Sequence, residues 1–430
     1  MKRICIIGTG RVGLVTGTCL AELGNNAICV DSDAQKIRDL AKGIMPFYEP
    51  GLEEMVRKNV DQGRLGFITS LEKGINSSEI IFICVGTPQK INGECDLSFI
   101  EAVAQEVAIA MDSYKIVVEK STVPVKTGAR VKQIIKLASG RDIDFDMVSN
   151  PEFLREGAAI YDFMKPDRII IGVESQRAAN AISELYKPLN APILITNIET
   201  AELIKYASNS FLALKISYIN AIANLCEKMG ADVTKVAEGI GYDKRIGRVY
   251  LDAGAGYGGS CLPKDVSALT KIAEGAGYDF ELLRAVQGIN DFQKRQVVVK
   301  AQKALGDLNN KTIGVLGLSF KPDTDDIREA PSLDIIRLLQ NEGAKIKAYD
   351  PVAMSEVKPL LPDVECCPGP YQVAEGSDAL ILITEWDEFK NLDLARIQRT
   401  LRQPVMIDGR NIYNPQTMAE LGFKYQSVGR

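Results

Sequence analysis

Short apolar runs alternate with longer mixed segments over the first part of the chain. The apolar runs cover residues 3–7, 27–30, 80–85, 116–119, 147–149 and 168–173, and turn residues bound each of them. The stretches between them are long enough for crossover helices, and residues 14–23 form the first of these. Repeated alternation of strand and helix predicts a parallel, doubly wound sheet.

The pattern changes near residue 199, where strand-like runs stop and Ala, Leu, Ile, Lys and Glu dominate. An apolar stripe at steps of 4, 3, 4 and 3 consists of Leu212, Ile216, Ile219, Ala223 and Cys226. This stripe predicts a helix of about thirty residues, roughly 45 Å long.

The ends of this helical region carry further signals. Thr196 and Glu199 have the spacing of a capping box, and residues 279–305 predict a second long helix. Helices of this length join domains or pair with a second chain, so we expect a homodimer. An internal core helix is the alternative interpretation.

Strand-like runs return after the turn cluster at residues 306–310, at 311–318, 344–350, 378–384 and 405–408. The turn at Gly314 and Gly317 lacks the full glycine spacing of a dinucleotide site, so this layer need not hold a dinucleotide. We therefore predict an α/β protein with two Rossmann-like, doubly wound parallel-sheet domains joined by a helical domain with a long central helix. The predicted boundaries are 1–198, 199–305 and 311–430.

Composition excludes several classes of function. The net charge of −5 gives no overall attraction to nucleic acids or anionic membranes, and no window of 18 uninterrupted apolar residues exists to span a bilayer. The nine cysteines have no regular spacing, which argues against a disulfide framework or a metal site. We expect a cytoplasmic protein with reduced thiols and no metal, nucleic-acid or membrane partner.

The chain contains no histidine. This absence removes Ser-His-Asp triads and H-E-x-x-H zinc sites. Proton transfer must therefore fall to carboxylates, Lys, Tyr, Cys or bound water.

A dinucleotide site is indicated near the N-terminus. Gly8, Gly10 and Gly13 follow a strand and open a helix, so backbone amides can approach a pyrophosphate. Asp31 ends the next strand, 18 residues after Gly13, and its carboxylate favours NAD over NADP. Thr87 ends another strand at the same expected edge, as a second contact or simply as a strand-ending turn.

Cys261 is the candidate nucleophile. It ends a glycine-rich loop at residues 254–261, and Lys264 and Asp265 follow closely. A nearby cation or helix N-terminus would lower its pKa and supply thiolate. The other eight cysteines lie in apolar strands, in helical runs or in loops without an activating group. A tight loop with an incidental small residue remains the alternative for Cys261.

These motifs carry a resemblance to a known family. The matching segments are Gly8–Gly13, Ser121-Thr122-Val123-Pro124, and residues 150–157, 201–209, 256–265 and 320–328. Over essentially its whole length the chain resembles the UDP-glucose/GDP-mannose dehydrogenase family, and within it the UDP-glucose type. Enzymes of the UDP-N-acetylmannosamine type usually carry His where this chain has Ser260.

The resemblance implies an NAD-dependent, four-electron oxidation of UDP-glucose to UDP-glucuronate. Cys261 would form a thiohemiacetal with the aldehyde, and then a thioester that water hydrolyses. The alternatives are a dehydrogenase for another nucleotide sugar (GDP-mannose or a UDP-N-acetylhexosamine), a single-step enzyme that stops at the aldehyde, and a non-catalytic NAD-dependent sensor.

The resemblance also implies residue roles. Lys205 and Asn209 would stabilise the alkoxide and oxyanion at C6, while Thr122 and Glu152 would hold a water. Asp265 would orient the hydrolytic water, and the general base stays open between Glu152, Asp265 and water. From the bare sequence, Asn150-Pro151-Glu152 equally fits the start of a helix.

The remaining implied contacts form two sets. The UDP-glucose set is Glu152, Phe153, Leu154, Arg155, Glu156, Lys205, Asn209, Tyr250, Leu251, Asp252, Ala253, Gly254, Gly258 and Lys321. The NAD set is Gly8, Gly10, Arg11, Val12, Gly13, Asp31, Lys36, Thr87, Thr122, Glu156, Lys264 and Arg328.

Overall fold

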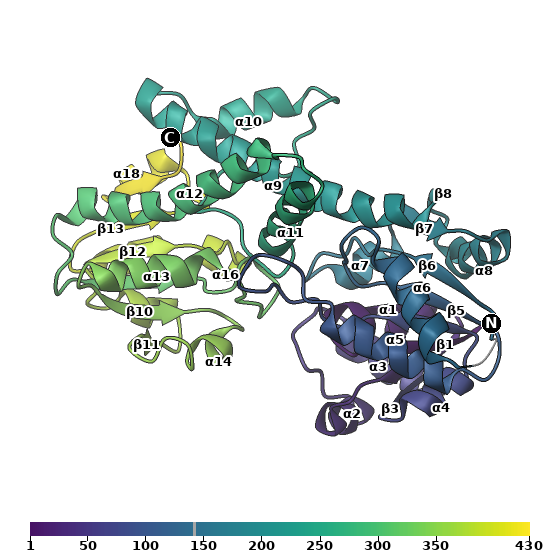
Figure 1. The fold of residues 1–430 in the computed structure, drawn as a ribbon. Coiled ribbons are helices and arrows are strands. Elements are labelled where there is room, and N and C mark those ends of the chain that lie inside the picture. The colour runs from purple at the N-terminus through teal and green to yellow at the C-terminus, as the bar shows by residue number, and fades with distance from the viewer. Residues whose placement is uncertain (141–142) are drawn as a thin grey trace. The chain divides into compact units, whose positions relative to one another are not determined.

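The computed structural model describes residues 1–140 and 143–430 (Figure 1). The chain divides into two compact units, and each is described by itself. Unit 1 comprises residues 1–208 and 271–276, and unit 2 comprises residues 209–270 and 277–430.

An eight-stranded sheet forms the centre of unit 1, in the order β3-β2-β1-β4-β5-β6-β7-β8. Its strands are β1 (Arg3–Ile7), β2 (Asn26–Val30), β3 (Leu65–Ile68), β4 (Ile80–Ile83), β5 (Lys115–Glu119), β6 (Phe145–Ser149), β7 (Ile169–Val173) and β8 (Ile193–Thr196). All neighbouring strands are parallel except β6 and β7, where Val148 pairs with Val173 in the antiparallel sense. The predicted parallel, doubly wound sheet is confirmed, and the β6–β7 junction is an exception that the sequence did not indicate.

Helices cover both faces of this sheet. They are α1 (Arg11–Glu22), α2 (Ala34–Ala41), α3 (Leu52–Asp61), α4 (Leu71–Asn76), α5 (Ser98–Ala110), α6 (Thr127–Ala138), α7 (Ala159–Met164), α8 (Gln176–Tyr186) and the 3-10 turn η1 (Lys187–Leu189). Ile4 and Ile6 of β1 belong to one buried cluster, and Cys5 and Ile7 belong to the other. Successive side chains of a strand point to opposite faces, so both faces of the sheet are packed as a doubly wound fold requires.

The predicted long helix is α9 (Ile198–Met229), which has 32 residues. The predicted cap is wrong: Thr196 lies in β8, and the side chain of Asn197 accepts the hydrogen bond from the Thr200 amide at 2.8 Å. Asn197 is a residue type that caps helices well, and it stands directly before the first helical residue.

The helical region contains more than the two predicted helices. α12 (Glu281–Leu305) confirms the second, but α10 (Val233–Gly241) and α11 (Leu262–Gly275) lie between it and α9. Glycine-rich segments flank both shorter helices, which obscured their helical periodicity in the sequence.

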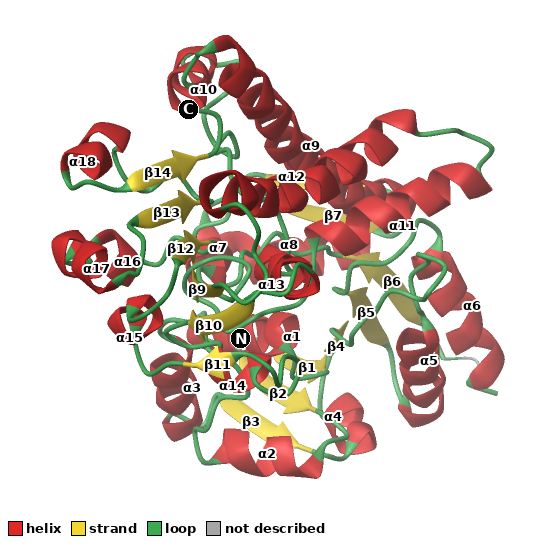
Figure 2. Ribbon diagram, turned by 90° about the vertical axis from the view of Figure 1, so that its left-hand side faces the viewer, coloured by secondary structure: helices red, strands yellow, loops and turns green. Residues whose placement is uncertain are grey.

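Unit 2 contains a second sheet, in the order β11-β10-β9-β12-β13-β14, with all neighbours parallel (Figure 2). Its strands are β9 (Thr312–Leu316), β10 (Lys345–Tyr349), β11 (Glu365–Cys366), β12 (Ala379–Leu382), β13 (Val405–Asp408) and β14 (Lys424–Ser427). Ala379 and Ile381 of β12 pack in one buried cluster, and Leu380 and Leu382 pack in the other. This sheet is therefore also covered on both faces.

The helices of this second α/β layer are short except for the first. They are α13 (Pro331–Asn341), α14 (Met354–Val357), α15 (Pro370–Ala374), α16 (Asp387–Lys390), α17 (Leu394–Thr400) and α18 (Pro415–Glu420). Among the helices of residues 1–140 and 143–430, none combines the length and the apolar character needed to cross a membrane.

Candidate active site

The glycine turn of unit 1 has the geometry that a pyrophosphate requires. A Cβ on Gly13 would lie 1.9 Å from the Gly8 carbonyl oxygen, so Gly13 permits close packing of α1 on the turn. A Cβ on Gly10 would meet nothing within 4 Å, which leaves open space in front of the helix. Gly10, the N-cap residue of α1, makes no side-chain hydrogen bond to the first turn of the helix. These features fit a dinucleotide phosphate at the helix N-terminus.

The two side chains that open α1 differ in their surroundings. Arg11 forms an ion pair with Glu156 at 3.5 Å and stacks on Phe47 at 4.8 Å from the ring centroid. Val12 is half-buried and packs on the buried cluster that contains Ile4 and Ile6. The structure therefore links two residues of the expected NAD set, Arg11 and Glu156.

Asp31 stands at the end of β2, as predicted. Its carboxylate accepts hydrogen bonds from the Thr9 amide at 2.9 Å, the Thr9 hydroxyl at 2.6 Å and the Lys36 ammonium at 2.9 Å. Burial alone would raise its pKa, but these donors and the Asp33 amide outweigh burial and lower the pKa to about 2. Asp31 is thus ionised near neutral pH, and it repels an additional 2′-phosphate.

The ends of β4 and β5 are joined through two predicted residues. The Thr87 hydroxyl donates to the Thr122 carbonyl oxygen at 3.0 Å. Both side chains are half-buried. This contact holds Thr87 and Thr122 at the carboxyl edge of the sheet, where ligands of such sheets bind.

A buried ion pair joins Glu152 to α9. The Lys205 ammonium donates to Glu152 Oε1 at 2.9 Å, and both side chains are 4% exposed. Burial opposes ionisation of Glu152, but Lys205, the Leu154 amide and the nearby charge of Lys120 lower its pKa. Glu152 is therefore a carboxylate near neutral pH.

Residues 150–157 form an extended loop and not a helix start. The Asn150 side chain does not cap a helix: its amide donates to the Ile170 carbonyl oxygen at 2.7 Å. Phe153 lies beneath the Arg168 guanidinium and the Lys205 ammonium, at 3.7 Å and 5.3 Å from the ring centroid. Leu154 packs partly on the core, and Arg155 is exposed and paired with Asp162 at 2.7 Å.

Cys261 of unit 2 directly precedes α11. Its carbonyl oxygen accepts from the Asp265 amide at 2.9 Å, the first hydrogen bond of that helix. The side chain is partly exposed, with the Ser260 hydroxyl 3.5 Å from the sulfur. The positive end of a helix favours negative charge on this sulfur. Cys5, by contrast, is buried in β1, and burial raises its pKa to about 12.

A polar cluster in unit 2 is centred on Asp265, which is 1% exposed. Asp265 accepts from the Asn209 amide at 2.6 Å and from the Lys264 ammonium at 2.6 Å. Three predicted residues, from α9 and from the first turn of α11, are thus brought together. The ammonium of Lys264 is paired with the carboxylate of Asp265. The sequence did not indicate this pairing.

The loop that leads to Cys261 is held by buried side chains that sequence reasoning missed. Asn290 of α12 accepts from the Tyr257 amide at 2.8 Å and donates to the Tyr257 carbonyl oxygen at 3.0 Å. Asn220 of α9 accepts from the Gly254 amide at 2.9 Å. A Cβ on Gly258 would lie 2.1 Å from the Glu329 carbonyl oxygen, so Gly258 permits close backbone packing. The sequence did not reveal these contacts, because helix periodicity does not show that the amide side chains of Asn220 and Asn290 face this loop.

The other predicted substrate residues of unit 2 differ in exposure. Tyr250 has a positive φ of 66°, Leu251 and Ala253 are buried, and exposed Asp252 pairs with Arg248. Lys321 is half-buried with its ammonium 5.8 Å from the Phe320 ring centroid. Arg328 is exposed and forms a bidentate pair with Asp326. The segment bearing Arg328 is tied to the cysteine loop, because the Gly259 amide donates to the Arg328 carbonyl oxygen at 2.9 Å.

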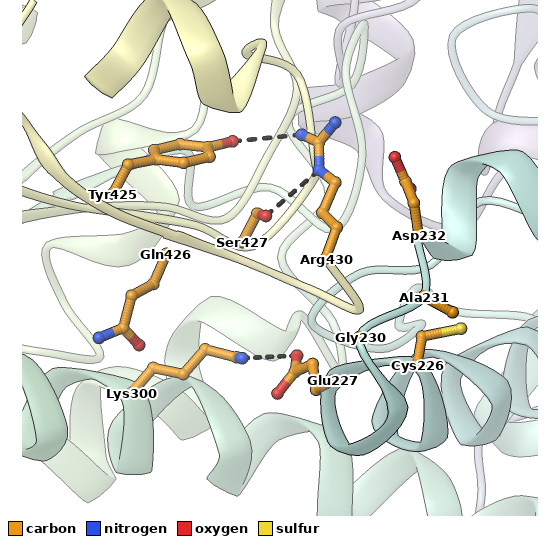
Figure 3. Close-up of a pocket in the computed structure, with 10 residues that line it drawn as sticks. All are labelled: Cys226, Glu227, Gly230, Ala231, Asp232, Lys300, Tyr425, Gln426, Ser427 and Arg430. Atoms are coloured by element: carbon orange, nitrogen blue, oxygen red, sulfur yellow. Dashed lines mark hydrogen bonds and ion pairs between the residues drawn. The ribbon is translucent and has the colours of Figure 1, made fainter. Parts of the chain in front are cut away.

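A separate cavity of about 410 Å³ in unit 2 contains none of the predicted site residues (Figure 3). Its lining includes the Glu227–Lys300 ion pair, at 2.6 Å, and the Arg430 side chain, which donates to Ser427. Its charged groups are already satisfied within the protein. Among the residues that the structure describes, no group of three or more Cys, Asp or Glu could hold a metal ion.

Comparison with known proteins gives consecutive matches along the chain. Profiles of the UDP-glucose/GDP-mannose dehydrogenase family match residues 2–190 (NAD binding domain), 199–292 (central domain) and 314–415 (UDP binding domain). The chain belongs to the UDP-glucose/GDP-mannose dehydrogenase family.

Individual relatives of this dehydrogenase family agree over the full length. The UDP-glucose 6-dehydrogenase TuaD of Bacillus subtilis is 50% identical over 100% of this chain and 94% of its own. A UDP-glucose 6-dehydrogenase of Rhizobium meliloti is 47% identical over 100% of this chain and 99% of its own length. The structure of a UDP-glucose dehydrogenase from Pyrobaculum islandicum matches with a TM-score of 0.94 and 38% identity, over 100% and 98% of the two chains.

A family member with a different sugar is less similar. The UDP-D-ManNAc dehydrogenase of Pyrococcus horikoshii matches with a TM-score of 0.87 and 28% identity, over 100% of this chain and 99% of its own. The family assignment also identifies the glycine turn and Asp31 as parts of the NAD binding domain. The cofactor of this dehydrogenase is NAD, as predicted.

Proposed function

We propose that this chain oxidises UDP-glucose to UDP-glucuronate with two successive NAD+ molecules, and that Cys261 is the nucleophile. The observation that carries the proposal is the position of Cys261, partly exposed before α11 in a loop fixed by Asn290. Full-length similarity to UDP-glucose 6-dehydrogenases supports the choice of sugar.

The first oxidation converts the C6 alcohol to an aldehyde. NAD+, when bound, accepts the hydride from C6. The C6 hydroxyl proton passes to Glu152 or to a water that Glu152 and Thr122 hold, because Glu152 is ionised beside Lys205. The Lys205 ammonium and the Asn209 amide stabilise the alkoxide. Their four-residue spacing on α9 places them one helical turn apart.

The second oxidation needs the sulfur of Cys261. Its thiolate adds to the aldehyde carbon, takes up a proton on oxygen and forms a thiohemiacetal. The C6 hydride of this adduct passes to the second NAD+ and its hydroxyl proton returns to Glu152 or the held water, which leaves a thioester. Water attacks the thioester carbonyl, the C–S bond breaks, and the acid and the thiol are released. Asp265, held by Asn209 and Lys264, orients this water. The covalent link also keeps the aldehyde from escaping between the two steps.

Ligand contacts follow from the same proposal. UDP-glucose is bound by residues 152–156, 250–254, Lys205, Asn209, Gly258 and Lys321, and the pyrophosphate of NAD by the turn at Gly8, Gly10 and Gly13. The remaining residues of the NAD set are Arg11, Val12, Asp31, Lys36, Thr87, Thr122, Glu156, Lys264 and Arg328. Open space at Gly10 and the ionised state of Asp31 support this assignment.

Product stoichiometry tests the proposed function. Purified protein given UDP-glucose, GDP-mannose or UDP-N-acetylmannosamine, each with NAD or NADP, is assayed for reduced cofactor and for the sugar product. We expect two NADH per UDP-glucose, UDP-glucuronate as product, and little turnover with NADP. One NADH per sugar, or a preference for another nucleotide sugar, would contradict the proposal.

A homodimer is also part of the proposal. Phe211, Tyr218, Leu225 and Met229 lie along α9 and are 50–72% exposed, which leaves an apolar face of unit 2 in water. An exposed face of this kind is typical of a protein interface, and a second copy of the same helix is the partner we propose.

Light scattering tests the dimer. We expect a dimer for the natural chain and a monomer for a Tyr218→Asp/Leu225→Asp variant, since two carboxylates cannot be buried without partners. Leu137→Asp, at a 76% exposed position on α6, is the matched control and leaves the mass unchanged. A monomeric natural chain, or a dimer that persists in the double variant, argues against this interface.

The proposal further places the enzyme in the cytoplasm. Cys261 must be a thiol to react with the aldehyde. A reducing compartment keeps it and the other eight cysteines in that form.

A further inference from the structure

Lys120 of unit 1 is a buried lysine that acts on Glu152 but, among the described residues, has no carboxylate bonded to its ammonium. Lys120 follows the last residue of β5 and is 4% exposed. Its ammonium donates to Asn150 Oδ1 at 3.0 Å and lies 3.4 Å from the Tyr186 hydroxyl oxygen. Burying an ammonium among neutral hydrogen-bond partners costs stability. This cost indicates that Lys120 has a role beyond packing.

The partners of Lys120 are themselves fixed. The Tyr186 hydroxyl of α8 donates to the same Asn150 Oδ1 at 2.6 Å, and the Asn150 amide donates to the Ile170 carbonyl oxygen of β7. Asn150 therefore cannot swing away from Lys120 without breaking bonds to two other elements. The ammonium thus has one defined position between the ends of β5 and β6.

This position connects two residues of the proposed mechanism. Lys120 stands two residues before Thr122, and Asn150 stands two residues before Glu152. The Lys120–Asn150 hydrogen bond consequently ties together the two strand ends that carry Thr122 and Glu152.

The charges around Lys120 also favour an effect on Glu152. The charged or titratable groups that act on it are Glu152, Lys205 and Cys84, and Tyr186 contacts it. Burial raises the pKa of Cys84 and of Tyr186, so neither is an anion near neutral pH. Adjacent Glu119 is buried and its pKa is raised well above the usual range by burial. Glu152 is therefore the anion that faces both ammonium groups, Lys120 and Lys205.

We propose that Lys120 is a positioning residue for the oxidation: it fixes the ends of β5 and β6, and its charge adds to that of Lys205 in favouring the carboxylate form of Glu152. Lys120 acts through Glu152 and Asn150 and does not touch the reacting atoms. The inference rests on the role proposed for Glu152.

The pH profile of kcat tests this inference, with Lys120→Met as the variant. Loss of a nearby positive charge raises the pKa of Glu152, so the acid limb moves to higher pH. We expect kcat near neutral pH to fall roughly 10-fold and KM to change little, because the hydrogen bond that ties the strand ends carrying Thr122 and Glu152 is lost. This loss is smaller than the roughly 10²- to 10⁴-fold contribution of a proton-transfer group itself.

Lys115→Met is the matched control. Lys115 begins the same strand, is 3% exposed, and donates to the Ser78 carbonyl oxygen at 2.7 Å, at the opposite end of β5 from Glu152. We expect this variant to retain the natural acid limb, whatever its effect on thermal stability. Tyr186→Phe keeps the lysine but removes one of its contacts, and we expect a smaller shift in the same direction.

The outcomes separate this inference from the proposed function. An acid limb at its natural position in Lys120→Met, or an equal shift in Lys115→Met, overturns the role of Lys120. If Lys120→Met does not fold, an unchanged profile in Tyr186→Phe overturns it. If the natural enzyme itself makes no UDP-glucuronate, the proposed function fails instead.

Discussion

We expect replacement of Cys261 with Ala or Ser to stop the release of UDP-glucuronate and to leave NAD binding intact. The aldehyde gives up a second hydride only after a nucleophile has added to it, and the Cys261 thiolate is the nucleophile that we propose. Alanine has no nucleophile, and a serine hydroxyl is far less ionised than a thiol near neutral pH. The measurement is quantification of UDP-glucuronate and NADH, with cofactor binding followed separately by fluorescence.

Cys366 supplies the matched control for this experiment. It is an exposed cysteine of β11 in the same unit as Cys261, without any of the loop contacts that fix Cys261. We expect Cys366→Ser to retain full production of the acid. Unchanged acid production in Cys261→Ala contradicts covalent catalysis at this residue.

Replacing Lys205 with Met lowers kcat by roughly 10²- to 10³-fold, the usual cost of losing one preorganised oxyanion partner. The ammonium is 4% exposed, and the low dielectric of a buried site strengthens its interaction with the negative charge that develops on the C6 oxygen. Steady-state kinetics with UDP-glucose measure the effect. Lys235→Met, which breaks an exposed ion pair with Glu238 on α10, is the control and leaves kcat unchanged.

A second variant separates the catalytic role of Lys205 from its structural role. Lys205→Met leaves Glu152 as a buried carboxylate without its cation, a change that typically costs about 3–5 kcal/mol of stability. Lys205→Met/Glu152→Gln removes that carboxylate, so we expect thermal stability to return while kcat stays low. Its kcat is compared with that of Glu152→Gln alone, because Glu152 is itself part of the proposed mechanism. An equal kcat in the two variants would show that Lys205 serves the fold alone.

The central strands and long helices could be predicted from the sequence because burial imposes a pattern on them. β12 is apolar throughout, β1 is apolar after its first residue, Arg3, and α9 carries a regular apolar stripe. The missed strands are β3, β8, β11 and β14. They are the edge strands of the two sheets, where side chains are partly exposed. β11 and β14 carry no apolar run, and β3 and β8 are mostly apolar but only four residues long, so the signal of a buried strand is absent or short.

The antiparallel β6–β7 pair could not be predicted for a different reason. Both strands are buried apolar runs, and strand direction depends on the path of the connection and not on composition. Residues 150–168 contain only the short helix α7, too little for the usual crossover between parallel neighbours.

Candidate site residues were predictable where a motif points to a chemistry, as for Gly13, Asp31 and Cys261. Their partners were not, because the contacts come from segments far apart in the sequence. Lys120 meets Asn150, which is 30 residues away, and Asn290 meets Tyr257, which is 33 residues away. A buried polar side chain shows its purpose only when the fold reveals what it faces.

The most direct test of the account is to locate the covalent intermediate. Enzyme mixed with UDP-glucose and NAD is quenched in acid, digested and analysed by mass spectrometry, with Asp265→Asn included because we expect slower thioester hydrolysis in it. The account predicts a UDP-glucuronyl group on the peptide that contains Cys261, released by hydroxylamine and absent from Cys261→Ala. Turnover to the acid with no adduct on Cys261, or an adduct on a different residue, would contradict it.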